Sequence, residues 1–345
     1  MPRQEDPRAS ETVFEYPGYP ARTDNLKTDR SALDRIWAVV VAFNPDDGFL
    51  ARLERVQAQI DNIVIVDNGS RNARVIEHAA QASRGSVELL RNPANLGIAK
   101  ALNQGLEVAI ARGAEWGLTL DQDSLPAPDM VRELMSSQRS LPDADKVAVV
   151  APQVIDTQFG RPSLFLRKRG RWLYRRVVCE DGLLDDVTAV ISSGSLVKLS
   201  LFRSLGGFRE DFFIDYVDTE YCLRAQANGF RIAVACGAHL EHKLGDRRQA
   251  SIAGVQMVPT FHSPPRWYYI SRNRIAMLRM YGSLFPHWLS YEVVAGTYGL
   301  LRMLLFEDRR LEKMRAVVWG TLDGLRGRMG RGPYHSELAL RANQR

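Results

Sequence analysis

The chain has 345 residues, of which 45% are hydrophobic and 25% are charged. This composition excludes a wholly disordered or fibrous protein, and the length allows one large core or a core with a smaller appendage. The three cysteines, Cys179, Cys222 and Cys236, have no spacing typical of a zinc site or a disulfide framework. We therefore expect a reducing, cytoplasmic compartment.

The formal net charge of +6 is unevenly placed, because residues 301–345 contain ten Lys or Arg against five Asp or Glu. A basic segment of this kind can attract an anionic surface. We expect no nucleic-acid partner, since no recognition helix or aromatic stacking motif accompanies the charge. At the other end, residues 1–34 are polar, contain four prolines and lack the apolar stretch of a signal peptide, which predicts a flexible leader.

Strands and helices alternate through the first half of the chain. The valine-rich run at 36–43 predicts a buried parallel strand, and apolar residues at helical spacing predict a helix at 46–59. The same signals predict strands at 63–66, 87–90 and 116–120, and helices at 73–82, 95–111 and 129–138. This alternation predicts an α/β fold with a doubly wound, mostly parallel sheet.

The regular alternation of strands and helices ends after a strand predicted at 147–150. Residues 159–184 are rich in Arg, Gly and aromatic residues and predict hairpin or loop structure, and 188–197 predicts a strand that is broken near Ser193. Helices are expected at 199–205 and 218–228, each followed by glycine.

Ligands of an open α/β sheet bind at the carboxyl ends of the strands. Neither a dinucleotide fingerprint nor a phosphate-binding loop follows a strand here. Asp121 and Asp123 follow the strand at 116–120, and their separation of two in extended chain places both side chains on one side. Such a pair also occurs in solvated acidic turns, but its position after a buried strand favours a divalent metal, Mg²⁺ or Mn²⁺, that holds a diphosphate.

Acidic residues cluster again between 212 and 224. Glu220 lies four residues before Arg224, which favours a surface ion pair. Asp218 shares its helix face with the small residues Cys222 and Ala225, so we expect it to point inward and to accept a proton from an attacking hydroxyl, with helix capping as the alternative.

Two histidines, His239 and His242, lie three apart in a predicted strand. Because side chains alternate along a strand, they point to opposite faces and cannot share an ion. One of them can still be a metal ligand, and His242 precedes a turn toward the predicted site; a structural role is the alternative for both.

Several motifs occur in an order typical of one enzyme family: VVVAFN, VIVDNGS, NLGIAKALNQGL, LTLDQDS, SSGSLV and DYVDTEYCLRAQANGF. Over residues 37–281 the chain resembles the family 2 glycosyltransferases with the GT-A fold. Within that family, LDQDS, ISSGSL, FFIDYVDTEYCLRAQ and RWYYISRNR are similar to bacterial rhamnosyltransferases, most closely to the type that adds the second rhamnose in rhamnolipid synthesis.

The resemblance implies a role for each matching residue on the donor side. The residues that it places near the nucleotide are Asn44, Asp67, Asn68, Gly97 and Asn103, although Lys100 stands where small residues are usual. It makes Asp121 and Asp123 the metal-diphosphate site and His242 a metal ligand. Asp218 becomes the catalytic base, while Val217 replaces the glutamate that normally precedes this base.

Further roles fall on the acceptor side and on the segment RWYYISRNR at 266–274. We expect Arg272 to meet the diphosphate, and Trp267, Tyr268, Ser193 and Gly194 to bind the acceptor. Core packing at the start of a helix is the alternative for the aromatic pair.

The segments divide into a GT-A domain at 35–265 and a helical C-terminal region at 266–345. Residues 284–306 are apolar but interrupted by His287, Glu292 and Arg302, which argues against a transmembrane span. An interfacial helix on the cytoplasmic face of the inner membrane and a helix packed on the protein's own core remain equal alternatives.

The resemblance implies inverting transfer of rhamnose from dTDP-β-L-rhamnose to a glycolipid such as mono-rhamnolipid. A family 2 enzyme of cell-surface polysaccharide or O-antigen synthesis, with another acceptor, is the alternative. A sugar-phosphate nucleotidyltransferase requires a glycine-rich, basic loop after the first strand, and this chain has AFNPDDG there.

Overall fold

The computed structural model describes residues 33–83, 86–243, 245–247, 250–252, 255–257 and 260–333. The predicted leader, except for its last two residues, and the end of the basic tail lie outside the described residues.

The first half of the chain forms the alternating elements that the apolar pattern predicts. They are β1 (Ile36–Ala42), α2 (Phe49–Gln57), β2 (Asn62–Asp67), α3 (Ala73–Ala82), β3 (Ser86–Arg91), α4 (Ile98–Ala111), β4 (Trp116–Asp121), β5 (Leu125–Pro126) and α5 (Met130–Ser140). Strands β4, β1, β2 and β3 are neighbours in that order, and each pair is parallel.

The second half extends this sheet. Its elements are a 3₁₀ turn (Ala144–Lys146), β6 (Val147–Asp156), β7 (Arg161–Pro162), β8 (Phe165–Lys168), β9 (Tyr174–Val177), β10 (Leu183–Asp185), β11 (Ser195–Lys198), α6 (Leu199–Ser204), a second 3₁₀ turn (Glu210–Phe212), α7 (Val217–Ala227) and β12 (Arg231–His242). The main sheet has the order β10-β12-β6-β11-β4-β1-β2-β3, and β11 runs antiparallel to both of its neighbours. The predicted mostly parallel, doubly wound sheet is confirmed.

The strand predicted at 188–197 is wrong in its first part, because only Ser195–Lys198 is extended. Gly194 has a φ of +79°, and the Ser195 amide donates to the Ser192 carbonyl at 3.0 Å. This turn leads into β11, and the Gly194 amide donates to the Thr119 carbonyl of β4 at 2.7 Å.

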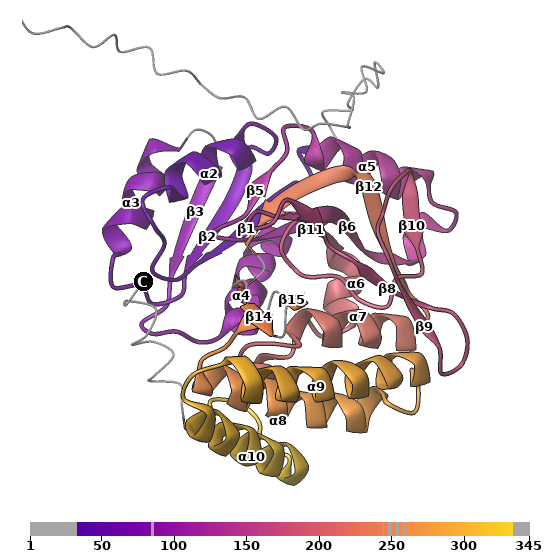
Figure 1. Cartoon of the computed structure of the whole chain (residues 1–345). Helices are drawn as coiled ribbons and strands as arrows, with labels where there is room; N and C mark the ends of the chain where they lie inside the picture. Colours follow the sequence, from indigo (N-terminus) through magenta and orange to yellow (C-terminus); the bar gives the residue numbers. More distant parts are fainter. Residues whose placement is uncertain are drawn as a thin grey trace, which may run out of the picture.

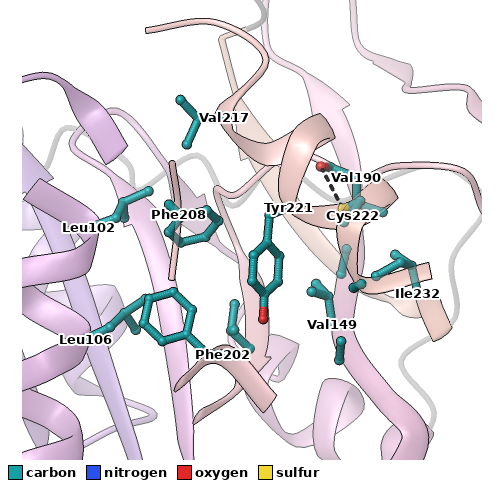
Figure 2. Close-up of a cluster of buried hydrophobic side chains, with 14 of the residues drawn as sticks. Leu102, Leu106, Val149, Val190, Phe202, Phe208, Val217, Tyr221, Cys222 and Ile232 are labelled. Atoms are coloured by element: carbon teal, nitrogen blue, oxygen red, sulfur yellow. Dashed lines mark hydrogen bonds between the residues drawn. The ribbon is translucent and has the colours of Figure 1, made fainter. Parts of the chain in front are cut away.

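Hydrophobic cores lie on both faces of the sheet, because successive strand residues alternate between them. Val39 and Val41 of β1 pack with α4, α6 and α7, whereas Ala38 and Val40 pack with α2, α3 and α5. Figure 2 shows the first of these cores, where the Tyr221 ring lies 4.9 Å from that of Phe208.

Three helices follow β12 and the short strands β13 (Asp246–Arg247), β14 (Ala250–Ile252), β15 (Val255–Met257) and β16 (Thr260–Phe261). They are α8 (Pro264–Tyr281), α9 (Pro286–Phe306) and α10 (Arg310–Arg326), and they form a layer beneath α7 (Figure 1). Helix α9 buries residues such as Trp288 and Glu292 but exposes many others. Within the described part of the chain, no helix is both long and apolar enough to cross a membrane.

The expectation that the cysteines form no disulfide is wrong. Cys179 and Cys236, 57 residues apart in sequence, form one, whereas Cys222 is free and buried. Antiparallel pairing of β10 with β12 brings the two together, and the Cys236 amide donates to the Gly182 carbonyl. Cysteine spacing alone contains no signal of this pairing.

Candidate active site

Polar side chains from four strands meet near one edge of the main sheet. Asn44 follows β1, and Asp67 and Asp121 are the last residues of β2 and β4. His242 ends β12, which runs parallel to β6 in the other half of the sheet. This is the edge at which an open α/β sheet binds its ligands.

Asp121, Asp123 and His242 each offer one ligand atom, and these three atoms lie within 4.8 Å of one another. His242 Nε2 is 3.8 Å from Asp121 Oδ2, and His242 Nδ1 is 3.4 Å from Asp123 Oδ1. Two carboxylate oxygens and an imidazole nitrogen suit a divalent cation such as Mn²⁺ or Mg²⁺. The cluster confirms that both aspartates face one side, and His239 does not take part in it.

Neighbouring residues hold the turn between the two aspartates in place. Gln122 accepts a hydrogen bond from the Phe43 amide at 2.6 Å through Oε1, and Arg52 Nε donates to the Gln122 carbonyl at 2.7 Å. Ser124 Oγ lies 3.2 Å from His242 Nδ1. These contacts join β1, α2 and β12 to the turn, so the cluster is positioned before any ligand binds. Sequence reasoning missed Gln122 and Ser124, although both belong to the LDQDS motif.

Asp218 lies in the first turn of α7, where burial raises the pKa of its carboxyl group and backbone hydrogen bonds from Thr219 and Ser192 partly oppose this. The helix cap is Tyr216, and its side chain makes no capping bond. Burial also raises the pKa of Asp121 to about 6; His242 opposes this shift, and the negative charges of Asp123 and Asp218 add to it, so Asp218 is near enough to Asp121 for the two charges to interact. The inward orientation predicted for Asp218 agrees with this placement.

The loop that leads to Asp218 has a strained backbone. Phe213, Asp215 and Tyr216 all have positive φ values, of 66°, 63° and 64°, which is rare for residues other than glycine. Asn273 Nδ2 of α8 donates to the carbonyls of Phe212, Ile214 and Asp215 at 2.8–3.0 Å. One α8 side chain therefore holds the loop in this conformation.

The structure corrects the expectation that Arg272 meets a diphosphate. Its side chain is 0% exposed, and its guanidinium donates to the carbonyls of Gly330, Asp211 and Phe212. Arg266, six residues earlier in α8, is the arginine at the site instead. Arg266 Nη2 lies 3.0 Å from Asp215 Oδ1, and its charge lowers the pKa of Asp121. Asp215 was the signal in the sequence for such an arginine, because a carboxylate in a folded protein interior requires a nearby cation.

The structure also buries all four residues expected at the acceptor. Trp267 Nε1 donates to Glu307 at 3.2 Å, and the Tyr268 hydroxyl donates to Asp323 at 2.7 Å, so both anchor the C-terminal helices. Ser193 Oγ accepts a bond from the Asp121 amide at 3.2 Å, and a Cβ on Gly194 would lie 2.8 Å from Leu240 and Pro152. The aromatic pair packs in the core, Ser193 bonds to the end of β4, and Gly194 packs closely against β6 and β12.

The residues expected near the nucleotide divide into two groups. Asn44 and Asp67 lie at strand ends; Asp67 Oδ1 accepts a bond from the Ser70 amide at 2.8 Å, and Asn44 Nδ2 is buried with no partner among the described residues. The other three, Asn68, Gly97 and Asn103, link elements together. Asn68 Nδ2 donates to the Gly97 carbonyl at 3.3 Å, and a Cβ on Gly97 would lie 2.6 Å from the Phe213 carbonyl oxygen. Asn103 Nδ2 donates to the Phe208 carbonyl at 2.9 Å.

Glu220 was expected on the surface, and this is wrong. It pairs with Arg224 as predicted, at 3.0 Å, but it is fully buried and also accepts the Tyr281 hydroxyl at 2.7 Å. Helix α8 covers this face of α7, and sequence spacing cannot reveal that cover.

Comparisons with known proteins agree with this geometry. Residues 37–206 match the family model described as Glycosyl transferase family 2. The chain is 31% identical over 306 residues to the dTDP-rhamnosyl transferase RfbF of Shigella flexneri, covering 87% of this chain and 99% of that protein. It is 20% identical to the low-salt glycan biosynthesis hexosyltransferase Agl10 of Haloferax volcanii, covering 89% and 96% of the two chains.

Solved structures share the fold at low identity. GalNAc-T7 with UDP, GalNAc and Mn²⁺ superposes with a TM-score of 0.53 at 15% identity over 88% of this chain, which corresponds to only 56% of that one. S. aureus TarS 1–349 in complex with UDP-GlcNAc gives 0.51 at 15% identity, over 84% and 80% of the two chains. The sheet is thus of the GT-A type found in glycosyltransferases. The family match and the full-length relative together show that this chain is a glycosyltransferase and belongs to family 2.

Proposed function

We propose that this enzyme transfers L-rhamnose, with inversion, from dTDP-β-L-rhamnose to a hydroxyl group of a glycolipid. The observation that carries the proposal is the Asp121–Asp123–His242 cluster at the carboxyl ends of the strands, with Asp218 and Arg266 near enough to Asp121 for their charges to change its pKa. The name of the Shigella flexneri relative, a dTDP-rhamnosyl transferase, supports the donor.

The cluster Asp121, Asp123 and His242 would hold a divalent metal, and their donor set fits Mg²⁺ or Mn²⁺. Such an ion withdraws charge from a departing nucleoside diphosphate. Arg266 adds a fixed positive charge that interacts with Asp121. Asn44 and Asp67, at the ends of β1 and β2, are our candidates for contacts to the nucleoside.

Asp218 acts as the general base. It takes the proton of the acceptor hydroxyl while the acceptor oxygen forms a bond to the anomeric carbon, and the bond from that carbon to the diphosphate breaks on the opposite face. The products are an α-L-rhamnoside, dTDP and a protonated Asp218. The partial burial of Asp218 favours this role, because it raises the pKa of the carboxyl group and so strengthens the carboxylate as a base.

The favoured acceptor is mono-rhamnolipid, an amphiphile that suits a catalytic domain at 35–265 joined to a helical region at 266–345 with many exposed apolar side chains. We place the enzyme in the cytoplasm, in peripheral contact with the inner membrane. Because Cys179 and Cys236 form a disulfide, this placement rests on the nucleotide-sugar donor and no longer on the cysteines. The second candidate is a growing surface glycan, which the glycan-biosynthesis name of the Haloferax volcanii relative favours.

The test is transfer by the purified full-length chain from dTDP-rhamnose to mono-rhamnolipid or to a lipid-linked oligosaccharide, with products identified by mass. Asp218→Asn should lower turnover by about 10²- to 10⁴-fold while donor binding persists, and the exposed Asp61→Asn is the matched control. Undiminished turnover by Asp218→Asn would remove Asp218 from the base role. Full activity of thoroughly metal-free enzyme would refute the metal site.

A further inference from the structure

The β8–β9 hairpin carries a concentration of positive charge. Its cationic side chains are Arg167, Lys168, Arg169, Arg171, Arg175 and Arg176. Within the described ranges none of the six forms an ion pair. Arg167 and Arg175 are direct cross-strand partners, an arrangement in which like charges repel. An external anionic partner would therefore offset the repulsion among the positive charges of the hairpin.

The tip of this hairpin combines that charge with exposed apolar surface. Trp172 is 53% exposed and Leu173 is 63% exposed. The tip is an ordered turn, since the amides of Arg169 and Gly170 donate to the Leu173 carbonyl at 2.9 and 3.1 Å. A tryptophan and a leucine beside arginines are typical of segments that enter the interface of a lipid bilayer.

A cavity of about 820 Å³ lies between the hairpin and the turn from α8 to α9. Hairpin residues 167–171 and residues 283–287 line it together with residues 226 and 229–232, and Asp186 is the one carboxylate among the lining residues that the structure describes. Leu284, in this lining, is 61% exposed. The cavity thus offers several cations and an apolar rim, which suits an anionic headgroup.

Helix α9 adds further apolar surface beside the hairpin. The rings of Tyr174 and Tyr291 pack edge to face at 5.4 Å and join β9 to α9, whose end lies next to β9 in Figure 1. The large apolar side chains that α9 leaves exposed are Val293, Val294, Tyr298, Leu301, Leu304 and Leu305. The sequence left open whether this helix is interfacial or core-packed, and it packs on one face only.

We propose that the β8–β9 hairpin, the cavity beside it and the exposed residues of α9 form a docking surface for a bilayer that contains anionic lipid. The cations meet headgroups while Trp172, Leu173 and Leu284 enter the interface. A nucleic acid would leave these apolar side chains in water. A second copy of the chain, docked through the same surface, would bring the same cations face to face. The inference gives a location to the membrane contact in the proposed function and does not depend on the sugar chemistry.

The test uses the full chain and two kinds of vesicle, phosphatidylcholine alone and phosphatidylcholine with phosphatidylglycerol, in a sedimentation assay at low salt. Wild-type protein should bind only the anionic vesicles. The double variant Arg169→Glu with Arg171→Glu, and independently Trp172→Ala with Leu173→Ala, should lower the bound-to-free ratio by about tenfold or more. The matched control is Arg55→Glu with Arg74→Glu on α2 and α3, where the same charge change should leave binding unaltered.

Three results would overturn the inference: equal binding to both vesicles, equal loss in the control, or displacement of the protein from vesicles by a short oligonucleotide. The same preparations are assayed for rhamnose transfer without vesicles. A chain that binds anionic vesicles but transfers no rhamnose refutes the proposed function alone. A chain that transfers rhamnose but binds no vesicle refutes the docking surface alone.

Discussion

At the scale of single residues, the partial burial of Asp218 has two opposite consequences. Because burial raises the pKa of Asp218 above the ordinary aspartate value of 3.8, turnover should fall as pH decreases through the shifted value. The acid limb of the pH–turnover profile should therefore lie above the ordinary carboxylate range. A limb within the range of an unperturbed aspartate would contradict the assignment of Asp218 as base.

The same shift lowers stability at neutral pH. A carboxyl group whose pKa is raised on folding stabilises the fold only at low pH, and this contribution is lost as pH rises through the folded value. Asp218→Asn, which keeps the shape without the charge, should thus leave the free energy of unfolding at pH 7.5 unchanged or higher. Denaturant titration at that pH provides the measurement, with Asp61→Asn as a control at an exposed site.

The raised pKa of Asp121 predicts how the affinity for a metal ion depends on pH. Burial and the neighbouring acids Asp123 and Asp218 raise its pKa to about 6 against the opposing charges of His242 and Arg266. A metal must displace that proton, so its affinity should fall by up to about tenfold per pH unit below 6 and level off above 7. Calorimetric titration of Mn²⁺ at pH 5.0, 6.0 and 7.5 measures this, and an affinity independent of pH would exclude Asp121 as a ligand.

At the scale of elements, α8 controls the loop that delivers Asp218 to the site. Asn273 satisfies three carbonyls of that loop, so Asn273→Ala should release the strained residues 213–216. We expect turnover to fall more than donor affinity, with a loss of about 1–3 kcal/mol in unfolding free energy. Kinetics at saturating donor, compared with donor binding by the same variant, separates the two effects.

Asn273→Gln gives a second comparison, because glutamine keeps the amide N–H donor but its longer side chain moves that donor away from the loop carbonyls. If both variants lose donor affinity and turnover to the same degree, Asn273 supports the fold in general and does not position the base.

The sequence predicts strands and helices well, because alternating and helical apolar spacing reports local burial. It also predicts Asp121, Asp123 and Asp218 as site residues. The apolar pattern shows where β4 ends and where α7 begins, and these residues lie at those two points. The roles within α8 were not predictable, since the covering helices decide which of its sides is buried. Arg272 and Trp267 therefore face the core, while Arg266, six residues from Arg272, reaches the site.

At the scale of the whole molecule, the C-terminal helices support the catalytic half of the chain. Helix α8 carries Arg266 and Asn273, and α10 holds α8 at close range through two glycines. A Cβ on Gly320 would lie 2.2 Å from the Tyr268 carbonyl oxygen, and one on Gly324 would lie 2.6 Å from that of Arg272. No larger residue fits at either position without separating the helices.

Gly320→Val should therefore cost about 1–3 kcal/mol of unfolding free energy, through overpacking against α8. Turnover should fall as well, since displacement of α8 moves Arg266 and Asn273 relative to Asp218. The control is Gly299→Ala on α9, where the added Cβ would make an ordinary contact of 3.6 Å with Trp267 and alanine favours the helix by up to about 1 kcal/mol. Unfolding midpoints in denaturant and turnover of both variants provide the comparison. If Gly320→Val retains wild-type turnover while it is destabilised, the site tolerates movement of α8, and the support that we assign to the C-terminal region is wrong.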